Sequence, residues 1–104
     1  MKREFFFNDD DEEKKFLIGD KDHVCKLIVT AIEESVAEGL SLTHVFTTVN
    51  SNRDYTITSE VKKEDWVESL DKCLGYFVDG ENYEWCDKIK KLKLVIENGD
   101  NKTD

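Results

Sequence analysis

Two short apolar runs enclose an acidic segment near the beginning of the chain. Residues 5–7 are three phenylalanines, residues 16–18 read Phe-Leu-Ile, and the eight residues between them are rich in carboxylates. Both runs have the length of a strand, so the economical prediction is a hairpin with an acidic loop. Strands that are apolar on both faces are normally covered on both sides, which a chain of 104 residues can do only in part. We therefore expect one phenylalanine, Phe6, to stay exposed as a partner site.

The middle of the chain predicts a helix followed by a second hairpin. Apolar residues recur at steps of three and four between residues 20 and 39, and Gly39 is suited to follow the end of a helix. Residues 42–49 and 54–61 are rich in β-branched and aromatic side chains, and the polar tetrapeptide at 50–53 favours a tight turn between them. This pattern predicts an antiparallel hairpin.

The last third of the chain predicts two more helices. Residues 63–78 show helical spacing of apolar side chains, and the same spacing returns after Asp79 and Gly80. A strand over residues 91–97 is the competing interpretation of the last segment, because its apolar residues also alternate. Gly75, inside the first of these helices, predicts a place where another backbone or an aromatic ring comes close, with Tyr83 or Trp85 of the next helix as the candidate.

These elements define the predicted fold class. Because 104 residues bury one modest core, we expect a single α+β domain over residues 1–99. In it, a small antiparallel sheet made of the N-terminal and the central hairpin packs against about three helices. Residues 100–104 are predicted to be a frayed polar tail.

The charge balance restricts the partners that the surface can attract. Twenty-four acidic residues against fifteen basic ones give a formal charge of −9, which repels nucleic-acid phosphates and anionic lipid headgroups and attracts a basic protein surface. We therefore expect no direct binding to nucleic acid and no membrane contact. No signal sequence and no apolar run long enough to cross a bilayer is visible. The three cysteines, an odd number without an export signal, indicate reduced thiols in the cytoplasm.

Signatures of metal binding and catalysis are missing from the sequence. The acidic run lacks the alternating ligands and central glycine of a calcium loop, no closely spaced cysteine pair suits zinc, and the isolated glycines form no phosphate-binding loop. The sequence therefore predicts no cofactor, no metal and no enzymatic activity. A small cysteine-dependent enzyme with Cys25 and His44 as its pair is an alternative that only the tertiary fold can test. Whether any cysteine is reactive is left open.

Carboxylates and aromatic side chains are the features best suited to binding another protein. Trp and Tyr are strongly enriched among binding hot spots, and four of them lie within twenty residues of each other. We predict a non-enzymatic acidic protein-binding module, a bacterial or phage adaptor or inhibitor that docks on a basic partner surface and in its sharpest form mimics a nucleic acid. The alternative is a structural homo-oligomer, held through the phenylalanine strand or through the lysines at 88–93. The predicted partner-binding residues are Asp9, Asp10, Asp11, Glu12, Glu13, Phe6, Trp66, Tyr76, Tyr83 and Trp85.

Overall fold

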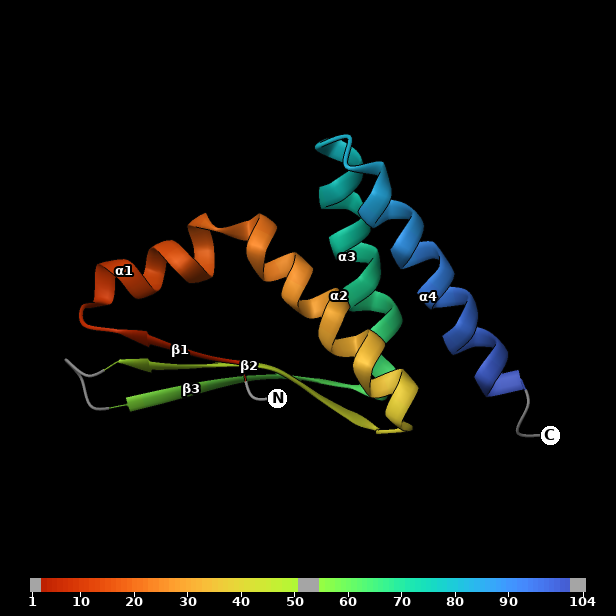
Figure 1. Cartoon of the computed structure of the whole chain (residues 1–104), viewed down its shortest axis with the longest axis horizontal. Helices are drawn as coiled ribbons and strands as arrows, with labels where there is room; N and C mark the ends of the chain where they lie inside the picture. Colours follow the sequence, from red (N-terminus) through yellow and green to blue (C-terminus); the bar gives the residue numbers. More distant parts are fainter. Residues whose placement is uncertain (1–2, 51–54, 102–104) are drawn as a thin grey trace.

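A three-stranded sheet carries its helices on one face (Figure 1). The structure, a computed structural model, describes residues 3–50 and 55–101. In chain order the elements are strand β1 (Glu4–Phe7), helix α1 (Asp10–Lys14), the π-helical turn η1 (Lys15–Gly19), helix α2 (Lys21–Glu38), strands β2 (Leu42–Asn50) and β3 (Tyr55–Lys62), the 3-10 turn η2 (Lys63–Asp65), and helices α3 (Trp66–Asp79) and α4 (Tyr83–Asn101). The fold class is α+β, as predicted.

The sheet is mixed, and the predicted purely antiparallel sheet is wrong. Its strand order is β1-β2-β3, with β1 parallel to β2 and β2 antiparallel to β3. The central hairpin of β2 and β3 is therefore confirmed. The N-terminal hairpin is wrong, because residues 16–18 lie in η1 and form no strand. The chain instead leaves β1 through α1 and η1, crosses over in α2 and returns beside β1 as β2.

The acidic run explains why the N-terminal hairpin does not form. Asp9 is extended and precedes α1, and its side chain accepts a hydrogen bond of 2.8 Å from the backbone N–H of Glu12. This is an N-cap, and carboxylates in the first turn of a helix are stabilised by the helix dipole. The carboxylates that resembled a hairpin loop therefore begin a helix, and Phe16 becomes a helical residue that packs on the sheet.

Two clusters of buried side chains make up the core. One fills the space between the sheet and the layer of η1 and α2, and its buried members are Phe16, Ala31, Val45 and Phe46. The other lies among α2, α3 and α4, and its buried members are Cys25, Val29, Ile32, Trp66, Leu70, Cys73, Phe77, Cys86, Ile89, Leu92 and Ile96. Ile28 of α2 and Val61 of β3 pack against both clusters, so these two elements join the two halves of the core.

A β-bulge in β2 gives the N-terminal residues an anchor. The register between β2 and β3 shifts between His44 and Phe46, and both Val45 and Phe46 are buried beneath the helices. The guanidinium of Arg3 donates to the carbonyl oxygens of Val45 at 2.8 Å and His44 at 3.3 Å, and it pairs with Glu34 of α2 at 3.0 Å. Arg3 therefore ties the edge strand, the central strand and α2 together.

The helices after the central hairpin form as predicted. Residues 91–97 are helical, which decides between helix and strand. Leu92 and Ile96 are buried whereas Leu94 between them is 58% exposed, so the burial follows the period of a helix and not the alternation of a strand. The close approach expected at Gly75 is wrong, because among the described residues neither a backbone atom of another element nor a ring atom lies within 4 Å of a Cβ built there.

Two predicted segments, the tail at 100–104 and the turn at 50–53, lie partly outside the described residues. α4 continues through residue 100 to Asn101, and the rest of the predicted tail, residues 102–104, lies outside the described ranges. Of the predicted turn at 50–53, Asn50 is the last residue of β2, and residues 51–53 lie outside the described ranges.

Candidate protein-binding site

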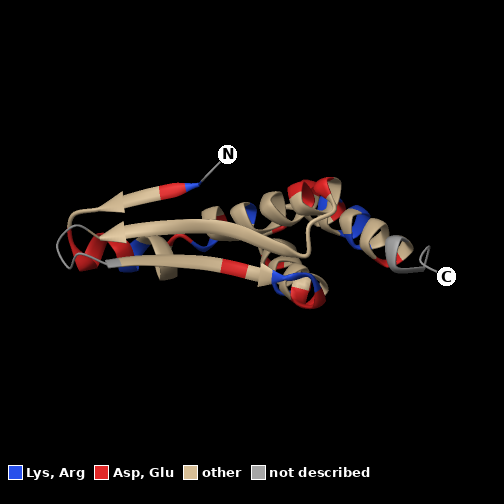
Figure 2. Cartoon of the chain, turned by 90° about the horizontal axis from the view of Figure 1, so that it is seen from below, with Lys and Arg blue, Asp and Glu red and all other residues tan. Residues whose placement is uncertain are grey.

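One face of the sheet has no helix over it within residues 3–50 and 55–101. Figure 2, seen from below, places the three strands in front of the helices. Side chains alternate along each strand, and the register aligns them in rows across the sheet, so every second residue belongs to this open face. On the described strands the open face is made of Glu4, Phe6, Leu42, His44, Thr47, Val49, Thr56, Thr58, Glu60 and Lys62.

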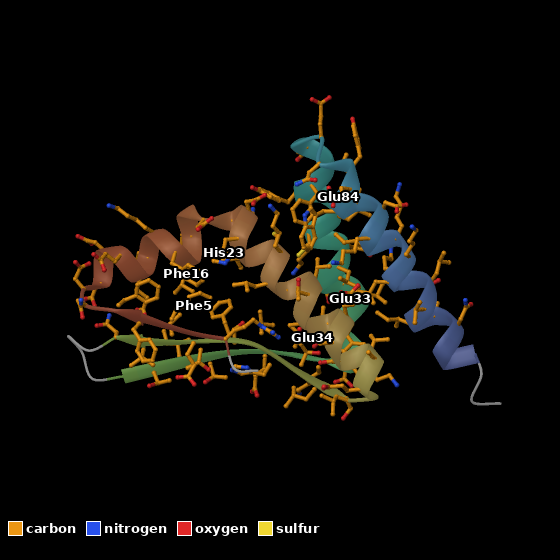
Figure 3. All side chains as sticks on the ribbon, in the orientation of Figure 1. Phe5, Phe16, His23, Glu33, Glu34 and Glu84 are labelled. Atoms are coloured by element: carbon orange, nitrogen blue, oxygen red, sulfur yellow. The ribbon has the colours of Figure 1, made fainter. Side chains whose placement is uncertain are left out.

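Phe6 is the most prominent side chain of the open face. It is 72% exposed, whereas Phe5 and Phe7 on either side of it point to the helical layer and are half-buried. The ring centroid of Phe16 lies 4.7 Å from that of Phe5 and 5.5 Å from that of Phe7. Figure 3 shows Phe5 and Phe16 between β1 and the helices above it. The predicted exposure of one phenylalanine is confirmed, and the alternation of the strand selects Phe6.

Hydroxyl groups dominate the middle of the open face. His44 Nε2 and Thr47 Oγ1 are 2.7 Å apart, and Thr47 Oγ1 is 3.5 Å from Thr58 Oγ1 across the strand pair. In the register, Phe6 and Val49 are neighbours in the row beside this group. The open face therefore offers an apolar end around Phe6 and a polar, β-branched centre. Sequence analysis missed His44, Thr47 and Val49 as surface residues, although the alternation of the second hairpin strand was a signal for such a face.

The five carboxylates of the acidic run divide into structural and exposed groups. Asn50, at the end of β2, donates to Asp10 at 2.8 Å and to Glu13 at 3.4 Å, and Glu13 is only 4% exposed. These two carboxylates hold α1 against the end of the sheet. Asp9, Asp11 and Glu12 are exposed. Asp9 follows Phe6 by three residues in the sequence, and α1 lies over the end of β1 on the helix-covered side of the sheet (Figure 1), so the exposed carboxylates are at the same end of the molecule as Phe6 but not on the open face.

The four other aromatic side chains of the predicted site lie away from Phe6, on α3 and α4. Trp66 is 2% exposed and belongs to the helical core, and its Nε1 has no acceptor among the described residues. Trp85 stacks on Phe77 at 5.6 Å, and Tyr76 meets Phe77 edge-on at 5.3 Å. Tyr83, at the first residue of α4, is 66% exposed. Of this group, Tyr83 is thus the one presented most fully to solvent.

The cysteine and histidine proposed as a catalytic pair lie on different sides of the sheet. Cys25 of α2 is buried among the helices, and the carbonyl oxygen of Cys25 lies 3.9 Å from Cys73 Sγ. His44 belongs to the open face, on the opposite side of β2. Burial raises the pKa of the Cys25 thiol and raises that of Cys73 to about 12, which keeps both thiols protonated at neutral pH. All three cysteines are buried.

The described residues bring no larger chemical constellation together. Within residues 3–50 and 55–101, no group of three or more His, Cys, Asp or Glu side chains is arranged to hold a metal ion. None of the helices in these ranges has the length and apolarity needed to cross a membrane. Comparison of the chain with protein families, with curated proteins and with solved structures finds no match. The open face and the exposed carboxylates of α1 are therefore the surfaces of this part of the molecule best suited to binding a partner.

Proposed function

We propose that this chain is a non-enzymatic protein-binding module of the cytoplasm, an adaptor or inhibitor that docks its open face on a basic partner surface. Phe6 is the apolar anchor of the contact, and Asp9, Asp11 and Glu12, at the same end of the sheet but on its helical side, extend the contact with negative charge. The observation that carries the proposal is the 72% exposure of Phe6 on a sheet face that none of the described helices covers.

The physical argument begins with the anchor. A phenylalanine buries more than about 150 Å² when it enters a pocket, and aromatic anchors surrounded by weaker contacts dominate many interfaces. The side chain on this face that lies next to it in the register is Val49, so the partner would meet a small apolar area. The exposed carboxylates begin three residues later and favour lysine or arginine around the partner's pocket.

A general basic surface is favoured over a nucleic-acid-binding groove as the target. Mimicry of a duplex needs rows of carboxylates spaced like phosphates on one face. On the described strands the open face carries two carboxylates, Glu4 and Glu60, together with the cation of Lys62. The exposed carboxylates of α1 form one short group at its end.

A pull-down from a lysate of the source cells tests the proposal. Immobilised wild-type chain is compared with Phe6→Ser and with Asp11→Asn combined with Glu12→Gln, at low salt and at about 0.5 M NaCl, where the Debye length falls to a few ångströms. Val78→Ser on α3 is the matched control, because Val78 is also a large exposed apolar residue, at 49%. We expect a basic protein that Phe6→Ser no longer retains, that the acidic double variant retains weakly, and that the control retains fully.

Two results would contradict the proposed function. One is that every protein retained by the wild type is retained equally by Phe6→Ser. The other is light scattering that shows a stable dimer dissociated by Phe6→Ser, because the open face would then hold a second copy of the chain and the homo-oligomer would be the better description.

A further inference from the structure

A second surface, on the side of α2 away from the sheet, has the properties of a binding groove. Two adjoining depressions between α2 and α4 share Val36 and Val95 and together form what we call the α2–α4 trough. Glu33, Val36 and Leu40 line it on the side of α2 and its end, and Lys88, Lys91 and Val95 line it on the side of α4.

The trough exposes apolar side chains from α2, its end and α4. Val95 and Leu40 are 54% and 47% exposed, while Leu92 and Ile96 below them belong to the helical core. In Figure 1, α2 and α4 run in the same direction with α3 running back between them. Three helices in this arrangement leave a groove between the two that run alike, and a fourth helix would bury the exposed apolar residues there.

The charge around the trough is opposite in sign to that of the whole chain. Its lining includes the lysines Lys63, Lys88 and Lys91 against one carboxylate, Glu33, whereas the chain carries a formal charge of −9. Glu33 lies on the α4 side of α2 (Figure 3) and is 3.6 Å from Lys88 Nζ. Lys91 pairs with Asp87 within its own helix at 2.9 Å. Such exposed ion pairs are worth little, so a partner's carboxylates can compete for these lysines.

We infer that the α2–α4 trough binds an amphipathic helix of a partner protein, one whose apolar stripe is flanked by Asp and Glu. The lining of the trough extends over residues 88–96 of α4, which is about 12 Å of helix. This length suits about two turns, so the partner would present apolar residues at positions i, i+3 or i+4, and i+7. The trough and the open face are separate surfaces, and this inference does not depend on the proposed function. Together the two surfaces would let the chain bridge a basic partner and an acidic helix.

The test is a selection from a displayed library of helical peptides randomised on all faces, against the full chain. Recovered peptides are resynthesised, and their affinity for the wild type and its variants is measured by fluorescence polarisation. Val95→Asp places a carboxylate in the centre of the trough, and Leu94→Asp is its matched control. Leu94 is the next residue, is 58% exposed, and lies in a separate depression with Lys90, Lys93 and Glu97.

We expect the recovered peptides to carry an apolar stripe bordered by Asp and Glu. Val95→Asp should weaken their binding at least about tenfold, as for the loss of a central anchor, and Leu94→Asp should leave it unchanged. Lys88→Glu combined with Lys91→Glu should weaken binding about three- to tenfold and reduce its salt dependence. Circular dichroism spectra that match the wild type would establish that each variant is folded.

Three outcomes would overturn the inference. The first is a set of peptides without excess acid. The second is binding that Val95→Asp leaves unchanged in a folded variant. The third is light scattering that shows a dimer dissociated by Val95→Asp, because the trough would then be occupied by a second copy of the chain.

Discussion

Two buried threonines on β2 reduce the stability of the fold. Thr43 and Thr48 lie on β2, on the side covered by helices, and are almost fully buried. Their hydroxyl oxygens have no hydrogen-bond partner among the described residues. A buried hydroxyl that loses its water without gaining a partner opposes folding. Thr48 is the clearer case, because it stands between Phe5 of β1 and Ile57 of β3 in the register.

Replacing Thr48 by valine should stabilise the protein. The methyl group fills the place of the unpaired hydroxyl at nearly constant volume, so we expect the free energy of unfolding to rise by about 1 kcal/mol. Urea denaturation followed by circular dichroism measures the change. Thr47→Val is the control for strand propensity, because Thr47 is half-exposed and its hydroxyl already meets His44. An equal gain in both variants would show that the buried hydroxyl has no special cost.

Cys73 should make the stability depend on pH in the alkaline range. Burial raises its pKa from 9.0 to about 12, so between these values the thiol ionises in the unfolded chain but not in the folded one. The stabilising effect is complete below pH 9 and is lost as the pH rises towards 12, by about 1.4 kcal/mol at pH 10. Unfolding measured from pH 8 to pH 11 should therefore show a steeper fall for the wild type than for Cys73→Ala. Parallel curves would contradict the raised pKa.

Some elements of the fold could be predicted from the sequence, and the segment after β1 could not. α2, α3 and α4 were predictable because their apolar stripes recur with the helical period and Gly39 ends α2 with φ at 72°. β2 and β3 were predictable from β-branched residues on both sides of a polar turn. The segment after β1 was not, because the cap made by Asp9 outweighs the strand-like composition of residues 16–18. A local cap of this kind decides an element whose apolar run is too short to show a period.

Gly75, inside α3, and Gly39, just after α2, should respond oppositely to substitution by alanine. Gly75 is helical, exposed and surrounded by open space, so Gly75→Ala should raise the free energy of unfolding by about 1 kcal/mol through helix propensity alone. Gly39 follows α2 with a left-handed φ of 72°, and Gly39→Ala should lower it by about 1 kcal/mol although no atom lies in the way. Thermal melts of both variants measure the signs. A loss of stability in Gly75→Ala would indicate a close neighbour after all.

At the scale of the whole molecule, shape and charge act together. The described part of the chain measures 50 × 30 × 19 Å, with a radius of gyration of 15.0 Å where about 13 Å is typical of this length. The extended shape follows from the two core clusters placed side by side and joined through α2 and β3. The sequence predicted the exposed phenylalanine, and the alternation along the second hairpin strand predicted a sheet wet on one side, with Thr56, Thr58 and Glu60 on that face. It did not predict the trough, because the trough depends on how α2 and α4 pack in three dimensions.

The excess of negative charge should make the fold sensitive to salt. At about 0.01 M salt the Debye length is about 30 Å, as large as the middle dimension of the molecule, so carboxylates on different elements repel each other. Raising NaCl to about 0.3 M should screen this repulsion and stabilise the fold by about 0.5–1 kcal/mol, seen as a higher melting temperature. A melting temperature that falls instead would mean that ion pairs such as Arg3 with Glu34 outweigh the repulsion.

The parallel pairing of β1 also affects how the chain emerges from a ribosome. Glu4 pairs with Thr47. Roughly forty further residues must therefore be synthesised after the phenylalanines before β2 is available to pair with β1, which takes several seconds. During this interval three adjacent aromatic rings are open to association with other nascent chains. The carboxylates that follow them immediately are charged gatekeepers of the type that flanks unavoidable apolar strands. The order of residues along the chain thus limits association of the nascent chain before β2 has been synthesised.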